Sequence, residues 1–320
     1  MIEYHEAVIE DVCAWPNLTM LGNGTILATL FNQPTHGRVP GDTDCWASTD
    51  GGRTWTKRST AARRPTADSV RMNWAAGLGT EGDFVAVCGG WHDPGEFKRL
   101  MTPVVRISHD GGRTWDDEIT FPASPKEATY VPFGDVLTGE DGALRVACYT
   151  VKPNEAYILR SADGGETWGE AVKMGGEINE CGWIHLGDGR WLAAFRTVEG
   201  QYLLEYRSDD DGRTWRKGGR ITEDRQHPGH LLRLRDGRIL LTYGDRREGH
   251  FGVEAKLSAD DGQTWGKPFR LADFDPADCG YPSSVQRADG KVVTAYYAQK
   301  SHLLDRYHMA VVIWTPAEAG

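Results

Sequence analysis

Short apolar segments recur in pairs along the chain, and a tight turn joins the two members of each pair. The clearest pairs flank an Asp-Gly or Asn-Gly turn and occupy residues 17–31, 182–196, 231–246 and 283–298. Looser copies lie at residues 78–90 and 136–150. Apolar segments joined by such turns are typical of antiparallel hairpins. The pattern therefore predicts six hairpins and an all-β protein.

A second repeat follows five of these hairpins. Its copies are STDGGRTW at Ser48, SHDGGRTW at Ser108, SADGGETW at Ser161, SDDDGRTW at Ser208 and SADDGQTW at Ser258. Successive copies begin roughly 50 to 60 residues apart, the spacing expected for one four-stranded propeller blade with its loops. The third-position Asp can accept hydrogen bonds from backbone amides, the invariant glycine can take a positive φ, and the closing Trp offers a large ring for packing.

Together the two repeats predict a six-bladed β-propeller of four-stranded blades that forms a single domain over residues 1–320. The hairpins outnumber the second repeat by one. We therefore expect the N-terminal strand and the final segment MAVVIWTP to complete the last blade and close the ring, which would remove exposed sheet edges. Residues 91–100 predict a long loop that either partly covers the mouth of the propeller or is a surface excursion.

Composition limits the partners of this fold. With 320 residues, of which 39% are hydrophobic, the chain can bury a large core as one domain. Its net charge of −10 argues against binding to nucleic acid or to an anionic membrane. The six cysteines are scattered, which favours buried thiols over a zinc site or a disulfide scaffold. No sequence feature suggests a metal or organic cofactor.

The opening segment has no basic stretch followed by an apolar one. As the sequence stands, this predicts a cytoplasmic protein, or a periplasmic or secreted one if a leader precedes it.

Alignment of the hairpins on their turn glycines places candidate site residues at one rim. Glu180 and Tyr281 fall at the same offset before Gly189 and Gly290, so we expect both at the entry of inner strands. The corresponding entry of another blade carries HPGH, with His227 and His230. Arg196, Arg246 and Arg247 follow their turns at similar offsets. Arginines that converge with Glu, Tyr and His predict a site for an acidic ligand, because guanidinium binds carboxylate through paired hydrogen bonds.

The second repeat resembles the Asp boxes of the sialidase (neuraminidase) superfamily, whose members are six-bladed propeller enzymes. The resemblance implies a tyrosine nucleophile activated by a glutamate, an arginine triad for the sugar carboxylate and an aspartic acid that protonates the leaving group. It implies that Tyr281 in CGYPSSVQRADG is the nucleophile and Glu180 in NECGWIHLGDG its base. Arg196, with Arg246 or Arg247, would bind the carboxylate.

Two positions depart from the family pattern. Ala14 in AWPNL stands where the first arginine is expected, and Arg38 falls where the acidic aspartate is expected. Asp42, Asp44 and His36 are the candidates for the acid, and Arg71 or Arg38 for the missing arginine. No other catalytic signature such as G-x-S-x-G or H-E-x-x-H occurs.

The sequence thus predicts a sialidase-like glycoside hydrolase that removes a terminal, acidic sugar, so that its partner is a carbohydrate. Two alternatives stay open. The first is a uronate-directed polysaccharide lyase, in which Tyr or His removes a proton beside an arginine-bound carboxylate. The second is a carbohydrate-binding propeller without catalysis, which the departures at Ala14 and Arg38 would favour.

Overall fold

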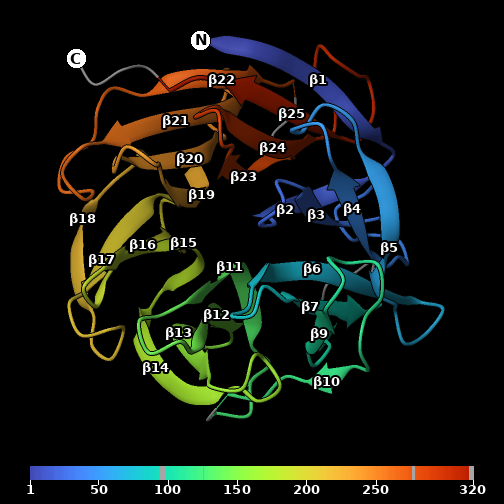
Figure 1. Ribbon diagram of the computed structural model, residues 1–320, viewed down its shortest axis with the longest axis vertical. Coiled ribbons are helices and arrows are strands. Elements are labelled where there is room, and N and C mark those ends of the chain that lie inside the picture. The colour runs from blue at the N-terminus through green and yellow to red at the C-terminus, as the bar shows by residue number, and fades with distance from the viewer. Residues whose placement is uncertain (94–98, 125, 276–277, 317–320) are drawn as a thin grey trace.

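The structure is a computed structural model that describes residues 1–93, 99–124, 126–275 and 278–316. The middle of the loop expected at residues 91–100 therefore lies outside the described residues. Within the described part the chain forms only strands, turns and loops, and no helix there could cross a membrane. Figure 1 shows the sheets arranged around a common centre, as in a β-propeller.

Four of the sheets have four strands each. One contains β1 (Ile2–Glu10), β25 (His308–Trp314), β24 (Val292–Ala298) and β23 (Cys279–Gln286), in that order. The second contains β2 (Cys13–Met20), β3 (Ile26–Phe31), β4 (Thr43–Ser48) and β5 (Thr56–Ala62). The third contains β15 (Ile178–Gly187), β16 (Arg190–Thr197), β17 (Leu203–Ser208) and β18 (Arg216–Arg220). The fourth contains β19 (Gln226–Arg233), β20 (Ile239–Asp245), β21 (Gly252–Ser258) and β22 (Phe269–Asp273).

The remaining strands form one sheet of nine strands. Its first group is β6 (Ser69–Leu78), β7 (Phe84–His92), β8 (Arg99–Leu100), β9 (Val104–Ser108) and β10 (Ile119–Thr120). Its second group is β11 (Val131–Thr138), β12 (Leu144–Val151), β13 (Asn154–Ser161) and β14 (Gly169–Gly176). A short parallel pairing of β6 with β11 joins the two groups, whereas the pairs of neighbouring strands within each group are antiparallel. The predicted hairpins are thus present as antiparallel strand pairs.

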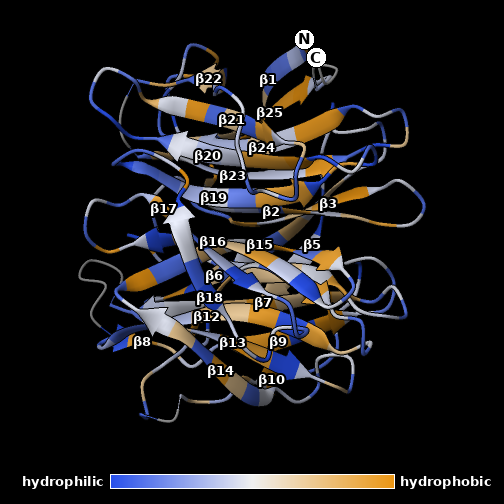
Figure 2. Ribbon diagram, turned by 90° about the vertical axis from the view of Figure 1, so that its left-hand side faces the viewer, coloured by the Kyte–Doolittle hydropathy of each residue, from blue (hydrophilic) through white to orange (hydrophobic). Residues whose placement is uncertain are grey.

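The hydrophobic core lies between neighbouring sheets. One buried cluster joins Leu18 and Ile26 to Val293 and Val311, which belong to adjacent sheets, and other clusters join the remaining pairs in the same way. Figure 2 shows hydrophobic residues concentrated on the strands, while many connecting loops are hydrophilic. All six cysteines belong to the described residues; they are buried and none is in a disulfide, which confirms that expectation.

One position in an inner strand requires glycine because two inner strands approach each other closely. A Cβ on Gly182 of β15 would collide with the carbonyl oxygen of Gly229 in β19. Any larger residue at position 182 would push these two strands apart. The narrow centre of the molecule therefore depends on glycine where the sheets meet.

The five copies of the second repeat form the predicted turn. In every copy the Asp Oδ1 accepts hydrogen bonds from the Ser hydroxyl and from the Thr backbone amide, and the amide of the invariant glycine donates to the Ser hydroxyl. The invariant glycine has a positive φ in each, for example 97° at Gly52. The sequence-based interpretation of the repeat as a turn is confirmed.

Asp50 offers a test of what these turns contribute to stability. Burial would raise its pKa, but hydrogen bonds from Thr54, Ser48 and the amide of Arg53 together lower the pKa to about 2. Because the folded pKa lies below the ordinary value of about 4, this stabilisation is present above pH 4 and is lost as the pH falls toward 2. We expect Asp50→Asn to lower the free energy of unfolding at pH 7 by about 1–2 kcal/mol. Urea unfolding at pH 7 and pH 3 measures this, and an equal loss at both pH values would contradict it.

Candidate active site

Irregularities in four inner strands place four side chains at the centre of the molecule. The strand register shifts between Cys13 and Asn17, Ile178 and Cys181, Gln226 and Gly229, and Gly280 and Ser283. Trp15, Glu180, His227 and Tyr281 lie within these irregularities. A bulge interrupts the regular alternation of a strand and can redirect a side chain, and bulges are frequent beside active sites. Equivalent breaks in four sheets therefore converge on one region.

Two of these residues have an unfavourable backbone conformation. Trp15 has a φ of 56° and Tyr281 a φ of 49°. Both values lie in the left-handed region, where large aromatic residues are rare because of steric conflict with the backbone. Such conformations cost about 1–3 kcal/mol and are concentrated at functional sites. The fold thus holds the Tyr281 and Trp15 rings, whose centroids lie 5.2 Å apart, at an energetic cost.

Tyr281, Glu180 and Arg196 form a chain of strong hydrogen bonds. The Tyr281 hydroxyl donates to Glu180 Oε1 at 2.5 Å, and Arg196 donates to Glu180 Oε2 at 2.8 Å. Tyr281 and Glu180 are both buried. A carboxylate so close to a phenol can accept its proton, and the arginine provides the counter-ion of the carboxylate. The structure therefore brings together the residues of β15, β16 and β23 that the hairpin alignment placed at one rim.

Arg246 adds a second positive charge beside the tyrosine. Its guanidinium lies over the Tyr281 ring, 5.0 Å from the ring centroid, and one nitrogen donates to the carbonyl oxygen of Cys279 at 2.6 Å. The Nε atoms of Arg196 and Arg246 are buried without a hydrogen-bond partner among the described residues. Each guanidinium has five N–H donors, so both side chains retain donors for an anionic ligand.

The surroundings of Tyr281 keep its hydroxyl protonated in the free protein. Burial raises the pKa of Tyr281, and the negative charge of Glu180 raises it further, whereas Arg246 and Arg196 lower it without reversing the rise. Burial alone would lower the pKa of Arg196, but the charge of Glu180 and its hydrogen bond to Arg196 raise the pKa overall. A neutral phenol beside an ionised carboxylate is the starting state required of a nucleophile with an adjacent base.

His227 lies near both arginines and is neutral. Burial lowers the pKa of His227, and the charges of Arg196 and Arg246 lower it further. Both ring nitrogens are buried without a hydrogen-bond partner among the described residues. A buried polar group without a partner is costly and often marks a ligand contact or an ordered water. His227 therefore belongs to the same region as the two arginines.

A second polar cluster adjoins the tyrosine. Asp278 accepts hydrogen bonds from His36 Nδ1 at 3.0 Å, from the Tyr297 hydroxyl at 2.6 Å and from the Tyr307 hydroxyl. The His36 ring lies 6.4 Å from the Tyr281 ring, measured between centroids. An open hollow of about 630 Å³ is lined by Thr35, His36, Arg38, Asp278, Gln299 and Tyr307. This cluster therefore combines a histidine and a carboxylate beside the candidate nucleophile.

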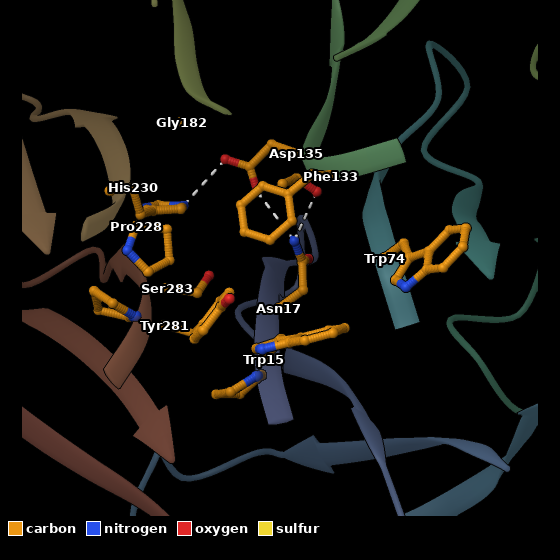
Figure 3. A pocket seen from close by; sticks show the side chains of 14 residues that line it. Trp15, Asn17, Trp74, Phe133, Asp135, Gly182, Pro228, His230, Tyr281 and Ser283 are labelled. Carbon is orange, nitrogen blue, oxygen red and sulfur yellow. Dashed lines mark hydrogen bonds and ion pairs between the residues drawn. The ribbon is translucent and has the colours of Figure 1, made fainter. Parts of the chain in front are cut away.

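The central channel contains a third polar group (Figure 3). His230 pairs with Asp135 at 3.0 Å, and Asn17 donates to the carbonyl oxygen of Gly134 at 2.9 Å. Figure 3 shows Tyr281 and Trp15 on the opposite side of this pocket from Asp135. The accessible space there is about 30 Å³, little more than that of a water molecule. His230 thus lines this pocket, and its polar partner is Asp135 rather than the Tyr281–Glu180 pair.

Four other predicted residues have partners elsewhere. Arg247 pairs with Asp245 at 2.7 Å. Arg71 is buried in β6 and donates to the backbone carbonyl of Arg63. Asp42 pairs with Arg64, and Asp44 with Lys57 across the β4–β5 pair. Within the described residues, no recorded interaction links these side chains to Tyr281 or Glu180. Ala14 lies in β2, but its side chain is outside the described part.

The sequence did not predict three residues of this region, which are Asp278, Tyr297 and Trp15. Tyr297 had a usable signal, because it follows Gly290 at the offset by which Arg196 follows Gly189. Trp15 directly follows Ala14, which stands where the family pattern has its first arginine. Asp278 precedes the tyrosine strand in a loop that belongs to neither repeat, so no periodicity marked it.

The assembled site can transfer a proton from Tyr281 to Glu180 and can bind an anion at Arg196 and Arg246. Among the described residues, no group of three or more His, Cys, Asp or Glu could hold a metal ion. Mainly antiparallel sheets around a common centre, five Asp-box turns and a Tyr–Glu–Arg site together define a propeller-like protein of the sialidase type. Residues 24–294 match the family model described as "BNR repeat-like domain", and the chain belongs to that family.

Curated relatives are consistent with this superfamily. The chain is 26% identical over 326 residues to a sialidase from Micromonospora viridifaciens, with 86% of this chain and 48% of that protein covered. It is 26% identical over 231 residues to a sialidase from Clostridium perfringens, with 62% of this chain and 59% of that protein covered. The chain thus matches only about half to three fifths of the length of these relatives.

Similar solved structures show the same fold. A protein of unknown function from Dyadobacter fermentans has a TM-score of 0.84 at 22% identity, with 98% of both chains covered. The Hadza microbial sialidase Hz136 has a TM-score of 0.76 at 20% identity, with 94% of this chain and 65% of that chain covered. Trypanosoma rangeli sialidase in complex with the inhibitor DANA has a TM-score of 0.71 at 17% identity, with 97% of this chain and 55% of that chain covered.

Proposed function

We propose that this protein is a sialidase-like glycoside hydrolase that removes a terminal acidic sugar and uses Tyr281 as its nucleophile. The observation that carries the proposal is the 2.5 Å hydrogen bond from Tyr281 to Glu180, with Arg196 bonded to Glu180 and Arg246 over the Tyr281 ring. Glu180 takes the hydroxyl proton while the Tyr281 oxygen attacks the anomeric carbon, and the leaving oxygen departs with a proton from an acid. Water then attacks the same carbon and returns a proton to that acid, and Tyr281 recovers its proton from Glu180. Two displacements at one carbon retain the anomeric configuration.

The preference for an acidic sugar follows from charge. Arg196 bonds to Glu180 and Arg246 lies over the Tyr281 ring, and both keep N–H donors for a carboxylate. Their charges also favour the negative charge that develops on the tyrosine oxygen. A neutral phenol nucleophile avoids the repulsion that a carboxylate nucleophile would meet from an anionic sugar. The curated sialidase relatives support the same substrate class.

We also propose that the fold is a six-bladed propeller whose ring is closed. The four four-stranded sheets and the two groups of the nine-stranded sheet make six blades. The pairing of β1 with β25 closes the ring within the last of them. Residues 1–320 then form one domain whose inner strands carry the active site, and this repeats the expectation from the sequence.

Trapping of a glycosyl-enzyme tests the proposal. The protein is first assayed on aryl sialosides, aryl uronosides and matched neutral glycosides, and we expect turnover of an acidic member. It is then incubated with 2,3-difluorosialic acid or a fluorinated uronosyl fluoride, according to that result. We expect a mass increase of one sugar on the peptide that contains Tyr281. Labelling of another residue would refute the nucleophile, an ultraviolet-absorbing unsaturated product would support the lyase, and binding without turnover would support the non-catalytic propeller.

A further inference from the structure

The cluster around Asp278 contains a histidine that is hydrogen-bonded to a carboxylate, as in many catalytic sites. Burial would raise the pKa of Asp278, but the hydrogen bonds of His36, Tyr297 and Tyr307 lower it well below its ordinary value. Asp278 is therefore a carboxylate that accepts hydrogen bonds from both tyrosine hydroxyls and from the histidine. A carboxylate bonded to Nδ1 fixes the ring orientation and tautomer of a histidine, and leaves Nε2 for proton transfer.

His36 lies beside the candidate nucleophile Tyr281, where its Nε2 could transfer a proton. Its ring packs edge-on against Trp15, 5.1 Å between centroids, and lies 6.4 Å from the Tyr281 ring. Nε2 has no hydrogen-bond partner among the described residues, and 26% of the side chain is exposed. The open hollow of about 630 Å³ begins at this ring and is large enough for part of a sugar or its leaving group. The His36 ring is thus partly exposed and lies near the Tyr281 ring.

We propose that His36, held by Asp278, is the acid and base that serves the Tyr281 reaction. The inference rests on the proposed function and adds the acid and base that the proposed mechanism requires. In the first step the His36 imidazolium gives its Nε2 proton to the glycosidic oxygen, as the bond from that oxygen to the anomeric carbon breaks. In the second step the neutral imidazole takes a proton from the attacking water, whose oxygen joins the anomeric carbon. The Tyr281 oxygen leaves and takes back its proton from Glu180, so every group returns to its starting state.

The rival acids are occupied by structural contacts. Asp42 is hydrogen-bonded to the amide and guanidinium of Arg64, and Asp44 is buried against Lys57. The groups that face His36 are Asp278 from the segment before β23, Tyr281 of β23, Tyr297 of β24 and Trp15 of β2, with Arg38 on its own loop.

Dependence on the leaving group distinguishes an acid from a structural residue. The wild-type protein and His36→Asn are compared on one acidic sugar with leaving groups that range from dinitrophenol to methanol. A leaving group of low pKa departs without a proton, whereas an alkoxide cannot. We expect His36→Asn to lose roughly 10²-fold or more in kcat/KM on the alkyl glycoside. We expect less than about 10-fold on the dinitrophenyl glycoside, so the rate becomes steeply dependent on leaving-group pKa.

Two further variants assign the roles. Asp278→Asn should show the same pattern with a smaller loss, because Asp278 is a positioning residue that acts through His36. Free imidazole should restore part of the activity of His36→Ala on the alkyl glycoside. His109→Asn is the matched control, since His109 also pairs with carboxylates, 2.8 Å from Asp83, but is exposed on an Asp-box turn. It should behave as wild type on every leaving group.

The outcomes separate the two proposals. If wild-type turnover depends on Tyr281 but His36→Asn loses the same factor on all leaving groups, or nothing, the acid assignment is overturned and the proposed function stands. If no acidic glycoside gives turnover that depends on Tyr281, the proposed function falls and this inference falls with it. Thermal unfolding of each variant shows whether a uniform loss reflects a damaged fold.

Discussion

Tyr281→Phe should lower kcat on the acidic glycoside by at least roughly 10³-fold, because the variant has no oxygen to attack the anomeric carbon. The change removes one hydroxyl from a buried position and leaves Glu180 paired with Arg196. We therefore expect the free energy of unfolding to change by only about 1 kcal/mol. Steady-state kinetics together with urea unfolding measures both effects.

Tyr243→Phe is a matched control for this variant. The Tyr243 hydroxyl also donates to a buried glutamate, Glu254 Oε2 at 2.9 Å, but this pair lies in β20 and β21, outside the site. It removes the same atom from the same kind of hydrogen bond. The control should retain wild-type kcat, and equal losses in the two variants would show that the effect is structural and not catalytic.

Arg196→Met should impair both stability and activity. The change leaves Glu180, which is only 7% exposed at its side chain, without its ion-pair partner. Removal of one partner of a buried pair costs about 3–5 kcal/mol, because the remaining charge has lost both water and its counter-ion. Arg196 is itself 18% exposed, so we expect a value near the lower end, about 3 kcal/mol. Turnover of the acidic sugar should fall roughly 10²-fold through the lost carboxylate contact.

The double variant Arg196→Met with Glu180→Gln separates these two effects. The amide introduced by Glu180→Gln carries no charge, so most of the lost stability should return, while activity should fall further because the base is also missing. A double-mutant cycle on the free energy of unfolding gives the coupling between the two residues. If the double variant is as unstable as the sum of the single variants, Arg196 stabilises the fold by packing and not by its charge.

The repeating parts of the molecule could be predicted because each was specified locally. The turn glycine and the Asp of each Asp box determine a turn regardless of its neighbours, and five copies in register gave the propeller-like arrangement. The same counting placed Glu180 and Tyr281 at equivalent points of two inner strands, and these points coincide with bulges in the structure. Arg246 and Arg247 could not be separated in this way, since the sequence does not say which of two adjacent side chains faces the site.

Residues whose partners are distant in sequence could not be predicted. His36 meets Asp278 across 242 positions, and both lie in loops outside the repeats. Asp42, Asp44 and His36 were equal candidates in the sequence because all three stand in one loop region. They differ in the structure because Arg64 and Lys57 pair with the two aspartates, while Trp15 and Asp278 hold the histidine. Side-chain pairing between sheets, and not local pattern, made that distinction.

The pairing of β1 with β25 constrains how the protein can be made. Among the strands of the described residues β1 pairs only with β25, and Met1 and Thr315 are joined by hydrogen bonds at 2.9 and 3.0 Å. During synthesis, residues 2–10 must therefore wait for residues 308–314 to leave the ribosome, while the intervening sheets can already form. Throughout that interval β1 presents an unpaired edge that another nascent chain could occupy. Ribosome-bound chains that end before residue 308 should accordingly be more prone to aggregation than the released protein.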